Sequence, residues 1–141
     1  MGDVSSDEPG APAEPNGGLP LDGDVLQYTA ATASLRPRQL APLIRTVQAH
    51  LGPRLETYRR AYERISADAD RVVFLVPDGH WAEVGSDLDL SEQEVDALGR
   101  AHAQQLRRLG TKTARREEFE TALEIREAVV IGRPGSDQAS S

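Results

Sequence analysis

The three histidines are the residues of this sequence best suited to acid–base or metal chemistry, but they form no recognisable site. His50, His80 and His102 lie far apart in the chain, whereas a helical zinc motif places two histidines four residues apart. His80 is the one placed for acid–base catalysis, since it follows an expected turn and lies near Asp78 and Glu83. Polar groups of this kind are common beside turns, so we expect no catalytic residue and no metal site.

Other signatures of catalysis are also missing from the sequence. No glycine-rich phosphate loop follows either expected strand, and no serine lies in a Gly-x-Ser-x-Gly elbow. The chain has no cysteine, which excludes a thiol nucleophile, thiolate metal ligands and disulfides. Its 141 residues are enough for one domain with a modest core, which excludes a multidomain enzyme. We therefore expect a protein without enzymatic activity and without a cofactor.

Arginine is the second residue type that could do chemistry here, by binding phosphate groups or an acidic partner. Basic residues concentrate in two expected helical segments, 35–66 and 100–116. The best candidates for contacts with phosphate or with a partner are Arg59, Arg60, Arg107, Arg108, Arg115 and Arg116. The alternative is that these arginines pair within the molecule, since blocks of acidic residues lie next to them in the chain.

Residues 81–98 resemble a helix-turn-helix unit. Val84 would be the buried residue of the first helix, Gly85 the small residue at which the two helices touch, and Val95 part of the inner face of the second helix. The sequence departs from the motif at its turn, where Asp89 stands in place of the usual glycine. The resemblance implies either a second helix that enters the DNA major groove or a corner that serves packing alone.

The charge of this unit favours a basic protein partner over DNA. Residues 78–96 contain seven acids and no base, so DNA phosphates would repel this surface. The acids expected to face a partner are Glu92, Glu94 and Asp96. We therefore expect a regulatory or protein-interaction module that binds another protein or a second copy of the chain. The alternative is a DNA-binding transcriptional regulator that contacts phosphates through its arginine-rich helices.

Apolar spacing and helix-stop residues predict where the first helices lie. A short helix is expected over 24–34. From Leu40 to Ile65 apolar residues recur at steps of three and four, which predicts a helix that begins near residue 38. Pro53 interrupts this stripe without changing its phase, so we expect either a kinked helix or two helices placed end to end.

The second half of the chain carries clearer boundary signals. Ser91 followed three residues later by Glu94 predicts a capping box at the start of a long helix. His102 falls on the apolar stripe of that helix, which predicts a hydrogen-bonded core residue. Gly110 is expected to end the helix in a left-handed cap, ahead of a further helix over 113–125.

Two β-branched segments predict the strands, and together with the helices they define the fold class. Residues 71–77 and about 127–132 are apolar runs bounded by Gly and Pro. Two strands that each need a partner most simply pair with each other, so we expect an α+β domain with a two-stranded sheet packed by four or five helices. This domain should span 21–132, between disordered tails at 1–20 and 133–141 that are rich in Pro, Gly or small polar residues.

Composition indicates the compartment and the chemical character of the surface. The formal net charge is −7, no apolar run approaches the length of a membrane span, and the N-terminal residues do not form a signal-peptide pattern. We therefore expect a cytoplasmic protein that does not bind membranes. Of 16 basic residues only Lys112 is lysine, and this bias in an acidic chain resembles proteins of salt-loving archaea, although a GC-rich genome would produce the same arginine bias.

Overall fold

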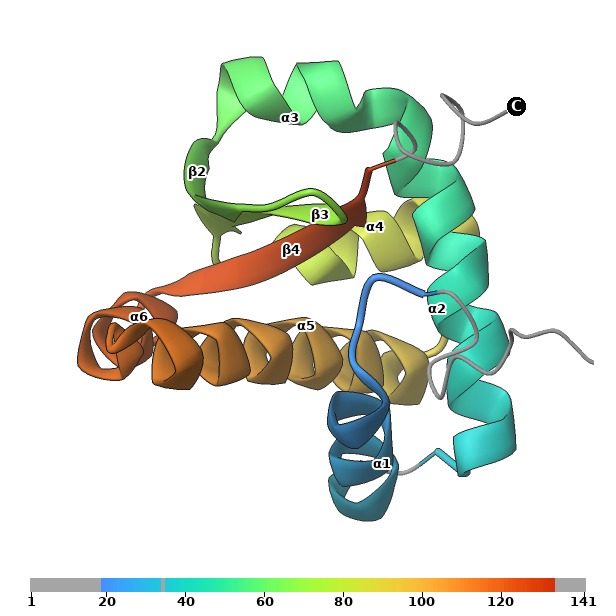
Figure 1. Ribbon diagram of the computed structural model, residues 1–141. Coiled ribbons are helices and arrows are strands. Elements are labelled where there is room, and N and C mark those ends of the chain that lie inside the picture. The colour runs from blue at the N-terminus through green and yellow to red at the C-terminus, as the bar shows by residue number, and fades with distance from the viewer. Residues whose placement is uncertain (1–18, 34, 134–141) are drawn as a thin grey trace, which may run out of the picture.

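The computed structural model describes residues 19–33 and 35–133, and these form an α+β domain, as predicted (Figure 1). The strands are β2 (Glu63–Ala67), β3 (Arg71–Pro77) and β4 (Arg126–Gly132). The helices are α1 (Gly23–Thr32), α2 (Pro37–Leu51), the short 3₁₀ turn η2 (Gly52–Arg54), α3 (Leu55–Ala61), α4 (His80–Leu88), α5 (Glu92–Thr113) and α6 (Arg116–Leu123). The expected tails fall almost entirely outside the described residues, but Leu19 is buried, so the folded part includes it.

The sheet has three antiparallel strands in the order β2-β3-β4, so the prediction of two strands was wrong in this respect. The apolar spacing predicts a helix as far as Ile65, but the helix ends at Ala61. The residues that follow form β2, which pairs with β3. β3 has five consecutive buried residues, so its backbone groups need partners on both sides, and here β2 and β4 supply them. The Asp68 side chain accepts from the backbone N–H groups of Asp70 and Arg71, which fixes the turn between β2 and β3.

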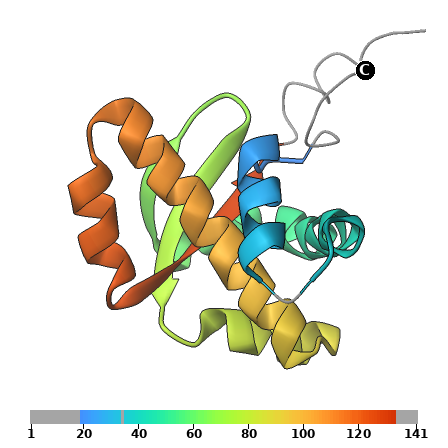
Figure 2. The same cartoon turned by 90° about the horizontal axis from the view of Figure 1, so that it is seen from below.

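Helices cover both faces of the sheet. Figure 1 shows α3 above the strands and α5 and α6 below them. On the upper face the Tyr58 ring lies 5.8 Å from the Phe74 ring of β3. On the lower face α5 runs across β4, and Figure 2 shows this helix crossing the sheet diagonally. Because both faces are covered, β3 and β4 read in the sequence as continuous apolar runs without alternation.

The outer edge of β4 is closed by the side chain of Gln48 from α2. Its Nε2 donates to the Val130 carbonyl at 2.7 Å, and its Oε1 accepts from the Gly132 N–H at 3.0 Å. One amide side chain thus makes the two hydrogen bonds that a neighbouring strand would make here.

Two further side chains continue this closure toward the start of β4. The Trp81 Nε1–H of α4 donates to the Ala128 carbonyl at 3.0 Å. The Nδ1 atom of His102, on α5, accepts from the Val130 N–H at 2.9 Å. The edge that β4 presents away from β3 is therefore hydrogen-bonded to three different helices.

The corner between α4 and α5 is closely packed around one glycine. A Cβ atom built on Gly85 would overlap Val95 Cγ2 and would lie 3.8 Å from Leu90 Cβ, so the two helices meet at this glycine. Asp89 adopts the left-handed conformation with φ of 58°. Ser91 Oγ accepts from the Glu94 N–H at 3.1 Å, which confirms the capping box.

The role predicted for Gly110 was wrong. The helix continues through it to Thr113, and Ala114 takes the left-handed conformation with φ of 61°. A Cβ atom on Gly110 would lie 2.9 Å from Arg116 Cα and 2.9 Å from Phe119 Cδ2. The glycine therefore allows α6 to pack closely against the end of α5, and it does not terminate the helix.

Candidate functional site

A cavity of about 810 Å³ opens between α4, α5 and the junction of α6 with β4. We call it the trough. Its volume lies in the range of ligand-binding pockets, and its walls are mainly apolar or small. The apolar and small side chains that line it are Trp81, Ala82, Gly85, Leu90, Val95, Gly99, Ala103, Leu123 and Ala128. In Figure 2, α4, α6 and the start of β4 lie along one side of the diagonal helix α5.

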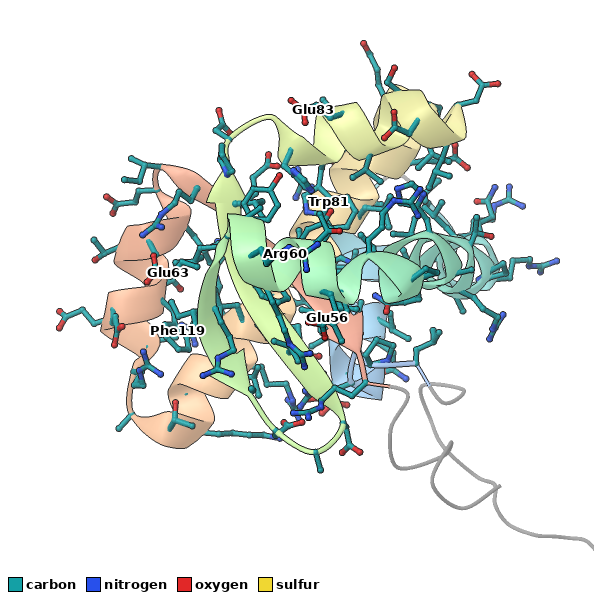
Figure 3. The ribbon with its side chains drawn as sticks, turned by 90° about the horizontal axis from the view of Figure 1, so that it is seen from above. Glu56, Arg60, Glu63, Trp81, Glu83 and Phe119 are labelled. Atoms are coloured by element: carbon teal, nitrogen blue, oxygen red, sulfur yellow. The ribbon has the colours of Figure 1, made fainter. Side chains whose placement is uncertain are left out.

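Trp81 is the largest residue of the trough and is held rigidly. It is 1% exposed, and its ring packs at 4.4 Å from the His102 ring. Its backbone N–H donates to Glu127 Oε1 at 2.9 Å, so a β4 carboxylate caps the first turn of α4. Figure 3 shows Trp81 pointing into the domain and Glu83, on the same helix, pointing away from it.

Acidic residues without a partner stand on the rim of the trough and on the outer face of α4. Asp78 and Glu92 line the trough, and within the described residues neither side chain makes a hydrogen bond or an ion pair. The same is true of the side chains of Glu83, Asp87 and Asp89, which are exposed on α4 and its turn. We call these five residues the acidic rim. No lysine or arginine lies between positions 78 and 92. Three arginines line the trough, but each already pairs with an acid: Arg100 with Asp96, Arg107 with Glu120 and Arg126 with Glu63.

The acids predicted to face a partner have three different environments. Glu92 is exposed and belongs to the acidic rim. Glu94 is engaged in the capping box, where its Oε1 accepts from the Ser91 N–H at 2.9 Å. Asp96 lines the trough and pairs with Arg100 at 2.7 Å.

Five of the six arginines predicted to contact phosphate or a partner form ion pairs within the chain. The pairs are Arg59–Glu56, Arg107–Glu120, Arg108–Asp22, Arg115–Glu118 and Arg116–Glu120. Arg115 makes two hydrogen bonds to its partner, at 2.8 and 2.9 Å, and lies 4.6 Å over the Phe119 ring. Arg60 is exposed on α3 and makes no ion pair within the described residues (Figure 3).

The hydrogen-bond partner of His80 is a tyrosine hydroxyl. It is 8% exposed, and its Nε2 lies 2.6 Å from the Tyr58 hydroxyl. Burial lowers the pKa of His80 against the opposing effect of Glu83, and burial raises the pKa of Tyr58 to about 12. The structure gives His80 no hydrogen bond to Asp78 or Glu83, and His80 does not line the trough.

His102 is a hydrogen-bonded core residue, as its position on the apolar stripe predicts. It is fully buried, and burial lowers its pKa to about 3. Since Nδ1 accepts from Val130, the proton of the neutral ring lies on Nε2, which has no hydrogen-bond partner among the described residues. Across residues 19–33 and 35–133 no three potential metal ligands come together, and no helix there is long and apolar enough to span a membrane.

Besides the strand β2, the sequence analysis missed two features of the structure. One is the trough, whose walls come from α4, α5 and the α6–β4 junction. The other is Asp22, which accepts hydrogen bonds from Arg71, Gln105 and Arg108 at 2.8–3.1 Å and so joins the start of α1 to β3 and α5. Burial opposes ionisation of Asp22, but these hydrogen bonds outweigh it and lower its pKa. Its partners are 49 or more positions away in the chain, beyond the reach of a local sequence signal.

Comparison with known proteins places the chain in a family without giving it an activity. The family model described as "Domain of unknown function (DUF8048)" matches residues 19–133, which is nearly the same span as the described residues. No curated protein and no solved structure matches the chain.

Proposed function

The chain belongs to the family of the domain of unknown function DUF8048, and we propose that it is a non-enzymatic protein-interaction module that binds a positively charged segment of a partner protein in the trough. The observation that carries this proposal is the combination of an apolar cavity with unpaired acids on its rim. Apolar walls supply binding energy through burial, and unpaired carboxylates select a cationic partner and speed its approach.

The arrangement of charge supports a protein partner over nucleic acid. The acids Asp78 and Glu92 keep their charge free beside the trough, whereas five of the six candidate arginines already have a carboxylate partner. A phosphate that replaced such a carboxylate would gain little, because the guanidinium group would leave one anion for another. The acidic face of α4 and its turn would also repel a nucleic acid that approached the trough.

The sole tryptophan gives a direct test, because Trp81 lies in the wall of the trough. Its fluorescence would be titrated with an amphipathic peptide of Lys, Leu and Ala and with the matching Glu, Leu and Ala peptide. We expect saturable binding of the cationic peptide only, weakening as salt is raised. Binding of duplex DNA in the same buffer, without binding of the cationic peptide, would overturn the proposal in favour of a DNA-binding regulator.

A pair of charge variants locates the binding surface. The double variant Asp78→Asn/Glu92→Gln should weaken the cationic peptide by about three- to tenfold, as expected for two rim charges. Glu117→Gln/Glu124→Gln is the matched control, since both glutamates are exposed, outside the trough and without an ion pair in the described chain. Equal weakening by both double variants would show that net charge, and not the trough, attracts the peptide.

A further inference from the structure

We infer that the partner segment binds the trough as an amphipathic α-helix laid along α5, a conclusion that rests on the proposed function and specifies its ligand. An extended segment would have to satisfy its backbone groups by adding to a strand edge. The strand beside the trough is β4, and its outer edge is already hydrogen-bonded to Gln48, Trp81 and His102. Ala128 lines the trough, and its carbonyl already accepts from Trp81 Nε1–H and is closed to a guest strand.

The opposite edge of the sheet does not reach the trough. β2 lies at the far side of β3 from β4, and none of its residues lines the cavity. A segment in the trough therefore has no backbone partner, and a helix is the conformation that satisfies its own N–H and C=O groups.

The dimensions of the trough fit a helix. The residues of α5 that line it share one face of that helix, because spacings of three and four relate them: Glu92, Val95, Asp96, Gly99, Arg100, Ala103 and Arg107. At a rise of 1.5 Å per residue this face is about 22 Å long, which corresponds to about four turns of a guest helix.

Small residues on the floor allow a second helix to approach closely. Gly99 and Ala103 occupy the middle of the α5 face, and Gly85 lies opposite on α4. A Cβ atom on Gly99 would meet only Trp81 Cδ1, at 3.7 Å, so the space over this glycine is open. Large apolar side chains of the guest at i, i+3, i+4 and i+7 would fill it, while its lysines and arginines would face Asp78 and Glu92 on the rim.

Two peptides of one composition and different order, together with a proline variant, test the conformation. The first is a Lys, Leu and Ala peptide of about 18 residues with leucines at helical spacing; the second has the same residues with leucine and lysine alternating; the third carries a central proline in the helical order. Titrated by Trp81 fluorescence and circular dichroism, the helical peptide should bind about tenfold or more tightly than the other two and gain helicity on binding.

The outcomes separate the two proposals. If the alternating peptide binds as tightly as the helical one, the inference of a helical guest is wrong and the proposed function stands. If no cationic peptide binds at low salt, both fail. If sedimentation of the protein alone shows a dimer that the helical peptide dissociates, the guest of the trough is a second copy of the chain, and the inference of a cationic helix from another protein is overturned.

Substitutions on the floor give an independent measurement. Gly99→Leu places a side chain in the open space of the trough and should weaken the helical peptide by about tenfold or more, with the thermal midpoint of the free protein unchanged or raised. Ala103→Leu is a second variant of the same kind. Gly52→Ala is the control, because a Cβ atom there meets nothing within 4 Å and Gly52 is outside the trough. Unchanged peptide binding in both floor variants would overturn the inference.

Discussion

Adding one methyl group at Gly85 tests the packing of the α4–α5 corner, on which both the fold and the trough depend. The Cβ atom of Gly85→Ala would overlap Val95 Cγ2. Valine in a helix has one strongly preferred rotamer, so Val95 cannot rotate away without cost, and α4 and α5 must move apart. Overpacking of this kind costs about 1–3 kcal/mol, and the better helix propensity of alanine returns at most about 1 kcal/mol.

We therefore expect Gly85→Ala to lower the free energy of unfolding by about 1–2 kcal/mol. For a domain of this size that corresponds to a fall in the thermal midpoint of about 4–8 °C, measured by circular dichroism or calorimetry. Gly99→Ala is the matched substitution on the facing helix. Its Cβ atom would make an ordinary contact of 3.7 Å with Trp81 Cδ1, so it should raise the free energy of unfolding by about 0.5–1 kcal/mol.

A double variant identifies the cause. Val95→Ala removes the Cγ2 atom that the new methyl group meets, so Gly85→Ala/Val95→Ala should be more stable than the two single effects added together, by about 1 kcal/mol. Additive effects, or stabilisation by Gly85→Ala equal to that by Gly99→Ala, would refute the conclusion that the helices meet at this glycine.

Three further predictions concern polar groups. Asp22→Asn should lower the free energy of unfolding, measured in urea, by about 2–3 kcal/mol, because Arg71 and Arg108 lose a charged acceptor. Folding lowers the pKa of Asp22 from 3.8, so the stability that Asp22 contributes should be lost as the pH falls below that value. Burial lowers the pKa of His102 from 6.5 to about 3, so the free energy of unfolding should fall by up to about 1.4 kcal/mol per pH unit below pH 6.5. His102→Asn should flatten this slope while leaving an acceptor for the Val130 N–H. An unchanged slope would contradict the conclusion that His102 is buried in its neutral form. Ser91→Ala should cost about 1 kcal/mol in thermal unfolding, and no loss would mean that the capping box adds nothing to α5.

The sequence predicted the features that depend on residues close together in the chain. Ser91 and Glu94 predict the start of α5. Gly85 and Asp89 predict the helix contact and the turn between α4 and α5. Each of these signals depends only on residues a few positions apart. The strand β2 was missed because Tyr62 and Ile65 continue the helical spacing of α3 although the chain has already changed conformation. Periodicity does not distinguish a helix from a helix followed by a short strand.

The trough could not be predicted for a different reason. Its walls include Trp81, Ala103 and Leu123, which come from three different helices. These helices come together only in the tertiary fold, and the sequence pattern of each helix gives no information about its neighbours. The same reason applies to Asp22 and Arg108, which form an ion pair across 86 positions. The arginines of α5 and α6 were identified as a basic block, but their partners could be assigned only once Glu118 and Glu120 were placed beside them.

The side-chain closure of β4 makes two of its backbone amides reporters of helix docking. The Val130 amide is held by a residue of α5 and the Gly132 amide by a residue of α2, whereas neighbouring amides of β4 are held by β3. In hydrogen exchange, protection at Val130 and Gly132 should therefore be lost when α5 or α2 moves away from an intact sheet. The same edge is open to strand pairing in any state in which the sheet has formed but α2, α4 and α5 are not docked, so loosening of these helices should expose the chain to aggregation.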